Sequence, residues 1–265
     1  MKLGFIGGGV MGEAIIAGVL RKGLVSPADI IACDIVAARR EQLQKAHGIK
    51  VTESAAEAVA ADLLVLAVKP QEFAAAGAAL AGHVAAHTAV MSIMAGVTIA
   101  SIRETLRHPA IVRAIPNTPA QVGEGVTVWT ATEAVSQEAR GEVGGILGVL
   151  GLEFYVDDEK YVDMATAVSS SGPAYVFLVI EALIDAAVHI GLRRDMAEKM
   201  VVQTVLGSAR YAQATGRHPA ELRNQVTSPG GTTTEGVLAL ENAGLRAAFM
   251  EAVEAAYEKA KLLGG

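Results

Sequence analysis

The feature that most constrains the fold is a run of glycines between an apolar strand and an apolar helix near the start of the chain. Residues 2–6 have a strand pattern, residues 7–12 are Gly-Gly-Gly-Val-Met-Gly, and residues 14–20 form an apolar helical stretch. Gly7, Gly9 and Gly12 fit G-x-G-x-x-G, in which the first glycine allows a tight turn, the second admits a pyrophosphate and the third lets the helix pack on the strand. The pattern predicts a dinucleotide-binding turn at the head of a parallel sheet.

A second predicted strand, residues 29–34, ends in an acidic side chain. Asp34 stands at about the distance from the glycines at which a carboxylate accepts hydrogen bonds from the adenosine ribose. Taken alone it favours NADH, because its charge would repel a 2′-phosphate. Arg39 and Arg40 follow within a few residues. Either they reach such a phosphate or they are solvated charges on the next helix, so the choice between NADPH and NADH stays open.

Strand and helix patterns alternate up to about residue 160. Further strands are expected at residues 63–68, 89–94, 110–115, 125–129 and 154–156, and helices at 53–61, 98–107 and 137–150. The strand at 63–68 is almost continuously apolar, as expected for a parallel strand covered on both faces. We therefore predict an α/β fold with a doubly wound sheet, in which ligands bind at the carboxyl ends of the strands.

The strand signal disappears after Tyr161. Helices are expected at residues 174–190, 194–215, 219–225, 236–242 and 245–263. We predict a dinucleotide-binding Rossmann domain over residues 1–160 and an all-helical dimerisation and substrate-binding domain over residues 161–265. The stretch 175–188 is apolar on most faces and needs burial on nearly every side. A short helical segment cannot provide that burial alone, so we expect a homodimer.

Composition excludes several function classes. The formal net charge is -6, only 4% of residues are aromatic and there is no basic run, which argues against nucleic-acid binding. The single cysteine, Cys33, excludes an intramolecular disulfide and a cysteine-rich metal site, and no metal is expected. Asp62, Glu181 and Asp185 interrupt the most apolar stretches, so no membrane span is expected. The glycine turn begins too early for a signal peptide, and we expect a soluble cytoplasmic protein.

A second glycine tract lies far from the first. Residues 228–235 are Ser-Pro-Gly-Gly-Thr-Thr-Thr-Glu. Gly230 and Gly231 leave the backbone open to close approach, and Thr232 and Glu235 have capping-box spacing, which predicts the start of a helix. Several N–H groups would then converge at a positive helix end and form a seat for a carboxylate or phosphate. The alternative is a capped junction between a loop and a helix.

Three loops directly follow predicted strands and are expected to line the cofactor crevice, near residues 68–71, 94–96 and 115–119. Lys69 lies in the first loop, where the alternative is a surface lysine in a turn. Asn117 lies between two prolines in a stiff loop. It is a candidate for an oriented polar contact, with an Asx-turn as the alternative.

Five blocks of this sequence, in the same order, resemble the Δ1-pyrroline-5-carboxylate reductase family, the enzymes of the last step of proline biosynthesis. The blocks are residues 4–11, 67–71, 116–119, 171–175 and 225–233. The last block contains Thr-Ser-Pro-Gly-Gly-Thr-Thr, which is close to the family's diagnostic signature. The resemblance covers essentially the full length. It implies a Rossmann domain, an interlocked helical dimerisation domain and a site shared between two subunits, with dimers that commonly assemble further into rings.

The resemblance also implies roles for individual residues. The substrate, a small cyclic imino acid, would place its carboxylate on the backbone amides near Gly230, Gly231 and Thr232. Thr233 is the catalytic candidate, because its hydroxyl would hydrogen-bond the ring nitrogen directly or through water. The other substrate-binding candidates are Ser171, Gln225 and Ser228. The NADPH or NADH cofactor would contact Ile6, Gly7, Gly8, Gly9, Val10, Met11, Gly12, Asp34, Ser54, Ala67, Val68, Lys69, Pro70, Ala95 and Asn117.

The chain departs from the family pattern at the adenosine half of the cofactor site. Many members have Ser/Thr-x-Arg after the second strand, where this chain has Asp34-Ile35-Val36, and members often have Asn where this chain has Ser54. Both departures weaken the case for a preference for NADPH.

Two rival functions remain. One is a different reductase, such as a β-hydroxyacid dehydrogenase or another imine reductase, but the predicted helix at 174–190 lacks the catalytic lysine of the β-hydroxyacid enzymes. The other is a non-enzymatic redox sensor or scaffold. The anion seat at Gly230 and Gly231 argues against the sensor, because a sensor has no evident need for a second ligand.

Overall fold

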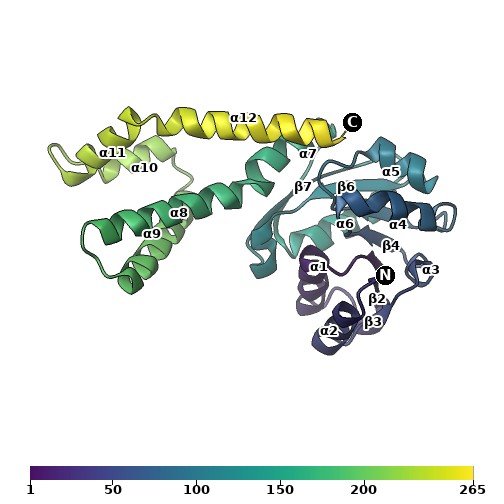
Figure 1. Ribbon diagram of the computed structural model, residues 1–265. Coiled ribbons are helices and arrows are strands. Elements are labelled where there is room, and N and C mark those ends of the chain that lie inside the picture. The colour runs from purple at the N-terminus through teal and green to yellow at the C-terminus, as the bar shows by residue number, and fades with distance from the viewer. Residues whose placement is uncertain (265) are drawn as a thin grey trace. The chain divides into compact units, whose positions relative to one another are not determined.

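The computed structural model describes residues 1–264, which form two compact units. The first unit contains Met1–Pro173 and the chain from Ala255 onward, and the second contains Ala174–Glu254. Figure 1 shows the mixed α/β elements of the first unit and the helices of the second.

The first unit is built on an eight-stranded sheet with the order β3-β2-β1-β4-β5-β6-β7-β8. Neighbouring strands are parallel except β6 and β7, which are antiparallel. The chain runs outward from β1 to β3 and returns to β4 on the other side of β1, which places a topological switch point between β1 and β4. The predicted doubly wound sheet is confirmed. The strands are β1 (Leu3–Ile6), β2 (Ile30–Cys33), β3 (Lys50–Thr52), β4 (Leu63–Leu66), β5 (Ala89–Ser92), β6 (Ile111–Ile115), β7 (Gly125–Ala131) and β8 (Gly151–Tyr155).

Two apolar clusters cover the two faces of the sheet. Leu3 and Phe5 of β1 join the cluster that contains residues of α1, α2 and α6, whereas Ile6 joins the cluster with residues of α3, α4 and α5. This alternation follows from the period of two in a strand, which sends successive side chains to opposite faces. The helices are α1 (Val10–Arg21), α2 (Ala37–His47), α3 (Ala55–Ala58), α4 (Phe73–Leu80), α5 (Ile99–Leu106) and α6 (Gln137–Gly148), with 3₁₀ turns η1 (Pro27–Asp29), η2 (Pro70–Glu72) and η3 (Thr118–Val122).

A short helical segment leaves the sheet after β8. It consists of α7 (Lys160–Ala165) and the π-helical turn η4 (Thr166–Ser170), and α7 contacts β6 and β7. Arg113 of β6 is 1% exposed and pairs with Glu159 at 2.7 Å and with Asp163 at 2.5 Å, which ties the start of this segment to the sheet. These contacts group α7 with the first unit, which extends to Pro173. The domain boundary predicted at residue 160 stays a prediction.

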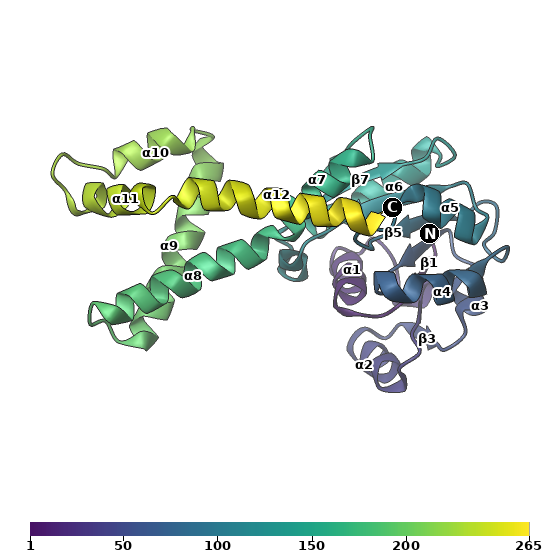
Figure 2. The same cartoon turned by 45° about the horizontal axis from the view of Figure 1, so that its top comes forward.

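The second unit is all-helical, as the loss of strand signal predicts. Its elements are α8 (Gly172–His189), α9 (Arg194–Thr215), α10 (Pro219–Gln225), α11 (Thr232–Asn242) and α12 (Leu245–Gly264), of which α8 begins and α12 ends in the first unit. In both views α10 and α11 lie side by side (Figures 1 and 2), and Arg223 approaches Glu241 to 3.8 Å between them.

This unit has almost no interior of its own. Ala197 is the one buried residue in its described part, and α8 leaves Phe177 58% exposed and Leu178 65% exposed. An exposed apolar surface of this kind indicates an interaction site, because contiguous exposed apolar side chains mark such sites. Residues 160–189 are also long and apolar enough to cross a membrane, properties that the core helices of soluble proteins share.

Several elements differ from the sequence-based expectations. The helix α4 was not predicted, because Phe-Ala-Ala-Ala-Gly-Ala-Ala-Leu lacks the polar positions that reveal a helical period. The strand β3 is three residues long, too short for a pattern. The helix α11 begins at Thr232 rather than residue 236, and Gly231 occupies its N-cap position without a side-chain cap. The predicted capping box, with Thr232 at the cap, is therefore wrong.

Candidate active site

The glycine turn after β1 is shaped by two close approaches. Gly7 has φ +93°, and a Cβ on it would lie 2.7 Å from the carbonyl oxygen of Ala67. A Cβ on Gly12 would lie 3.0 Å from the Gly7 oxygen and 3.3 Å from the Ala67 Cβ. Only glycine adopts this φ without strain, and only a residue without a side chain allows α1 to pack this tightly. The loops after β1 and β4 therefore meet at the switch point.

The opposite side of the same turn is open. Gly9 is the N-cap of α1 and has no side-chain cap, and a Cβ built on it would meet nothing within 4 Å. Val10, the next residue, is 62% exposed. The first N–H groups of a helix have no partner within the helix and lie at its positive end. This cradle fits the pyrophosphate of a dinucleotide, whose charge and size match such a helix start.

Asp34 lies at the carboxyl end of β2 with its carboxylate held by backbone groups. Its Oδ2 accepts from the Gly8 N–H at 2.9 Å, and its Oδ1 accepts from the Val36 N–H at 2.9 Å. Both oxygens keep further lone pairs for a ligand, since an ionised carboxylate accepts about four hydrogen bonds. The carboxylate is thus fixed beside the glycine turn, where a ribose would lie.

The two arginines after Asp34 are engaged in contacts within the protein. Arg39 donates from Nε to the Gly8 carbonyl oxygen and pairs through Nη2 with Glu13 at 2.6 Å. Arg40 donates to the carbonyl oxygen of Asp34 at 2.7 Å and pairs with Glu53 at 3.2 Å. Their side chains are only 19% and 18% exposed.

Glu13 anchors one of these arginines and stays ionised. Burial by itself would raise the pKa of Glu13, but hydrogen bonds from His47 and Arg39 outweigh it and hold the pKa below its usual value. His47 contacts Glu13 Oε1 at 2.9 Å. The only sign of this cluster in the sequence is an acidic residue, Glu13, in the first helical turn after the glycine motif.

The remaining candidates for cofactor contact follow the ends of strands β1, β3, β4 and β5. The Ala67 N–H donates to the Ile6 carbonyl oxygen at 2.8 Å, which continues the β1–β4 ladder into the loop. Lys69 is exposed and immediately precedes η2, which begins at Pro70. Ser54 is the exposed N-cap residue of α3 and makes no side-chain cap. Met11, Val68 and Ala95 are partly buried.

Asn117 holds two other segments in place. It is 8% exposed, its Nδ2 donates to the Ser169 carbonyl oxygen at 3.0 Å, and its Oδ1 accepts from the Val126 N–H at 2.9 Å. The side chain therefore links η4 to β7 instead of forming an Asx-turn. Its predicted cofactor contact stays a prediction, and its amide is already used within the fold.

Ser171 ends the π-helical turn η4. Its hydroxyl donates to the Thr166 carbonyl oxygen at 3.0 Å, and its N–H donates to the same oxygen at 2.9 Å. Single π-helical turns are frequent at functional sites. The structure thus gives Ser171 a defined place at the start of α8, and its contact with substrate stays a prediction.

The second glycine tract is a tight turn that closes on Ser228. Gly230 has φ +67°, and the Gly231 N–H donates to the Ser228 carbonyl oxygen at 3.0 Å. A Cβ on Gly231 would lie 2.4 Å from Ser228 Oγ. The Thr234 hydroxyl donates to the same Ser228 carbonyl at 2.8 Å. Sequence analysis gave Thr234 no role, yet it fastens the turn.

This turn presents the start of α11. Gly231 provides no side-chain cap, and the Thr234 N–H already donates to the Gly231 carbonyl oxygen at 3.1 Å, so the N–H groups of Thr232 and Thr233 are the ones left for water or a ligand. Thr232 is exposed and Thr233 is partly buried. Gln225, at the end of α10, has its amide beside the Arg217 guanidinium. The arrangement suits an anion at the N-terminus of α11.

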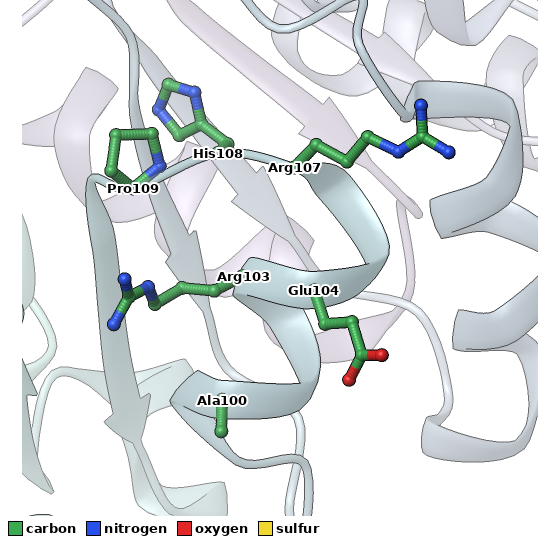
Figure 3. A pocket seen from close by; sticks show the side chains of 6 residues that line it. All are labelled: Ala100, Arg103, Glu104, Arg107, His108 and Pro109. Atoms are coloured by element: carbon green, nitrogen blue, oxygen red, sulfur yellow. The ribbon is translucent and has the colours of Figure 1, made fainter.

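A depression of about 470 Å³ lies elsewhere on the first unit, along α5 and the residues after it. Figure 3 shows that its Arg103 and Arg107 side chains point apart, and His108 is buried with its Nε2 2.7 Å from the Thr88 carbonyl oxygen. Its lining includes none of the candidate residues. Within the described chain, no group of three or more His, Cys, Asp or Glu residues could hold a metal ion.

Comparison with known proteins decides the family. Residues 159–263 match the family described as pyrroline-5-carboxylate reductase dimerisation, and residues 2–96 match the family described as NADP oxidoreductase coenzyme F420-dependent. The pyrroline-5-carboxylate reductase of Synechocystis sp. is 44% identical over 265 residues, which are 100% of this chain and 98% of the relative. The chain belongs to the pyrroline-5-carboxylate reductase family.

Solved structures agree with this membership. The pyrroline-5-carboxylate reductase of Coxiella burnetii superposes with a TM-score of 0.90 at 36% identity, and the alignment covers 100% of this chain and 98% of that one. The Plasmodium falciparum pyrroline carboxylate reductase with NADP bound gives 0.91 at 32% identity, with the same coverage. The predicted family, the enzyme class and the use of a nicotinamide dinucleotide are confirmed.

Proposed function

We propose that this pyrroline-5-carboxylate reductase family member reduces the C=N bond of Δ1-pyrroline-5-carboxylate with a hydride from NAD(P)H and forms L-proline, the last step of proline biosynthesis. The observation that carries the proposal is the presence of two separate anion seats. One is the Gly7–Gly12 turn at the start of α1, and the other is the Gly230–Gly231 turn at the start of α11. Two seats suit a dinucleotide and a carboxylate substrate, whereas a redox sensor needs only the first.

The first seat would hold the dinucleotide. The N–H groups at the start of α1 would face the pyrophosphate, and Gly9 leaves room for its approach. The ribose would lie at Asp34, and the loops after β4 and β5, with Lys69 and Ala95, would border the nicotinamide half. The cofactor supplies the hydride when bound. The contribution of these residues is to bind it, orient it and keep it at the switch point.

The second seat would hold the substrate carboxylate. The backbone N–H groups of Gly230 and Thr232 would bind it at the positive end of α11, on either side of Gly231, whose own N–H holds the turn by donating to the Ser228 carbonyl oxygen. This fixes the imine ring by its charged group and leaves the C=N bond for the hydride. Holding the substrate in a fixed orientation makes the hydride transfer effectively unimolecular and supplies much of the rate enhancement.

Thr233 would act on the ring nitrogen. A hydrogen bond to that nitrogen stabilises the charge that develops when the hydride arrives at carbon. A cyclic imine is basic enough that no strong buried acid is needed, and the tract offers none. We propose Ser171, Gln225 and Ser228 as further substrate contacts, in addition to the turn itself.

We propose that the protein is an obligate homodimer in which the helical domain, residues 161–265, forms the interface and the site is shared between subunits. The support is the exposed apolar surface of α8 and the match of residues 159–263 to a dimerisation family. A second copy would cover Phe177 and Leu178. Assembly of dimers into a ring, a cytoplasmic location and the lack of membrane or nucleic-acid contact belong to the same proposal.

Substrate choice tests the reaction. Purified protein should oxidise NAD(P)H with Δ1-pyrroline-5-carboxylate, and should neither oxidise 3-hydroxy acids with NAD(P)+ nor reduce their keto forms with NAD(P)H, with dinucleotide absorbance as the readout. The reverse pattern would overturn the proposal in favour of a β-hydroxyacid dehydrogenase.

Thr233 is tested by Thr233→Ala with Thr204→Ala as a matched control, since Thr204 bonds the Met200 carbonyl within α9. We expect Thr233→Ala to lower kcat/KM by roughly tenfold to a thousandfold, as for one lost transition-state hydrogen bond, while Tm is kept. The control should leave kcat/KM within about twofold. Unchanged turnover in Thr233→Ala would remove this hydroxyl from the mechanism.

A further inference from the structure

We infer that the adenosine end of the cofactor site selects NADH over NADPH, with Asp34 as the residue that sets the preference. The inference deepens the proposed function and rests on it for the reaction, but not for dinucleotide binding. Three observations carry it: the fixed carboxylate of Asp34, the engaged arginines that follow it and the uncharged residues between them.

The Asp34 carboxylate cannot easily turn away from an incoming ribose. The N–H groups of Gly8 and Val36 each hold one of its oxygens at 2.9 Å, so its charge stays at the carboxyl end of β2. A ribose with free 2′- and 3′-hydroxyls would donate to the remaining lone pairs. A 2′-phosphate at the same place would bring two negative groups together and would leave only the 3′-hydroxyl to donate.

Arg39, the first cationic residue after Asp34 in the sequence, is not available to offset that repulsion. All three guanidinium nitrogens of Arg39 have partners: Nε bonds the Gly8 carbonyl oxygen, Nη1 bonds Gln42 at 2.8 Å and Nη2 pairs with Glu13 at 2.6 Å. The lowered pKa of Glu13, where hydrogen bonds from His47 and Arg39 outweigh the effect of burial, keeps this partner charged. Arg39 therefore braces the glycine turn.

Of the two arginines, Arg40 is the better candidate to bind the 2′-phosphate of NADPH. Its Nη1 bonds the carbonyl oxygen of Asp34 at 2.7 Å, and its Nη2 pairs at 3.2 Å with Glu53, whose side chain is 79% exposed. An exposed ion pair of this kind contributes little energy. The pair with Glu53 is thus easily broken, but the bond to the Asp34 backbone directs the guanidinium toward the strand.

The side chains between Asp34 and the arginines offer neither a charge nor a hydrogen-bond donor to a phosphate, and only the first N–H groups of α2, which follow the N-cap residue Val36, could approach one. Ile35 is 86% exposed and Val36 is 54% exposed, and both are uncharged. Exposed apolar side chains directly after the ribose-binding carboxylate suit the flat face of an adenine. The site is therefore built for an adenosine without a 2′-charge.

The test is the affinity for each dinucleotide in the absence of substrate, measured by calorimetry at fixed ionic strength on the full-length protein. We expect NADH to bind roughly tenfold to a hundredfold more tightly than NADPH, the range that one hydrogen bond to a charged group contributes. Equal affinities, or tighter binding of NADPH, would overturn the inference.

Variants assign the preference to its source. Asp34→Asn should weaken NADH by about tenfold and strengthen NADPH, so that the two affinities approach each other. Glu53→Gln should strengthen NADPH by no more than about threefold, because Arg40 keeps its bond to the Asp34 carbonyl. Glu142→Gln on the exposed face of α6 is the matched control for a lost carboxylate and should change neither affinity. If a folded Asp34→Asn variant kept the wild-type ratio of NADH affinity to NADPH affinity, Asp34 would not be the determinant.

Turnover separates this inference from the proposed function. If NADH binds more tightly but neither dinucleotide supports imine reduction, the proposed reaction fails and the selectivity stands. If both dinucleotides bind equally and both support reduction of Δ1-pyrroline-5-carboxylate, the reaction stands and the selectivity is wrong.

Discussion

Gly7 and Ala67 approach each other so closely that a Cβ on Gly7 would lie 2.7 Å from the Ala67 carbonyl oxygen. They follow β1 and β4, the two strands on either side of the switch point. The contact brings the loops after these strands together, and the N–H of the next residue, Gly8, donates to Asp34 Oδ2 at 2.9 Å. The absence of a side chain on Gly7 thus affects both the packing of the sheet and the geometry of the cofactor site.

The substitution Gly7→Ala should therefore destabilise the fold and weaken dinucleotide binding together. The new methyl group would meet the Ala67 carbonyl, and φ +93° is strained for alanine, so we expect a loss of roughly 2–4 kcal/mol in the free energy of unfolding. Urea denaturation and calorimetry with NADH measure the two effects.

Gly9→Ala is the matched control for that change. A Cβ at Gly9 meets nothing within the protein and φ is -62°, so stability should change by less than about 1 kcal/mol. Dinucleotide affinity should nevertheless fall, because the methyl group would occupy the approach to the start of α1. Equal loss of stability in both variants would contradict the geometry of the turn.

The buried guanidinium of Arg113 predicts a large effect of a substitution in β6 on the stability of the first unit. Glu159 and Asp163 neutralise it, and Glu159 also accepts from the Ile99 N–H at 2.8 Å. We expect Arg113→Ala to cost about 3–5 kcal/mol in the free energy of unfolding, because it leaves two carboxylates without their buried partner. Arg113→Met, which fills the volume, should recover part of that loss, and denaturant unfolding at pH 7 measures both.

The stability of Arg113→Ala relative to the native protein tests whether the ion-pair network holds α7 to β6. If Arg113→Ala were as stable as the native protein, the network would not hold α7 to β6. A similar loss in Arg103→Ala, where the side chain is exposed on α5, would indicate a non-specific effect of removing an arginine.

Acid stability should depend on Glu13. Hydrogen bonds from His47 and Arg39 outweigh the effect of burial and lower its pKa in the folded protein below the ordinary value of 4.5. The stabilisation is therefore present above pH 4.5 and is lost as the pH falls through the folded value. We expect the native protein to lose more stability than Glu13→Gln over this acid range, as measured by urea unfolding at a series of pH values.

Glu104→Gln provides the comparison for that series. Glu104 is exposed on α5 and has no hydrogen-bond or ion-pair partner in the described part of the chain. Its variant should follow the pH profile of the native protein. A Glu13→Gln profile parallel to the native one would contradict the contribution of the Glu13 cluster.

Patterns with a clear period were readable in the sequence. The apolar run of β4 predicted a covered parallel strand, and the bounds predicted for α9 and α10 match those of the structure. By contrast, α4 escaped prediction because its eight residues are nearly all apolar and show no period, and β3 because three residues carry no pattern. A local signal therefore needs either two faces that differ or, as in β4, a short continuous run of apolar strand-forming residues.

The sequence by itself determined the family, the doubly wound sheet and the two glycine turns, because these depend on residue type and spacing along the chain. Only the tertiary structure decided what individual side chains do. Asn117 forms hydrogen bonds with Ser169 and Val126, and Arg39 forms an ion pair with Glu13. In each case the partners are more than eight residues apart in the sequence. Partners brought together by folding leave no local pattern, so their contacts emerge only once the strands and helices are packed.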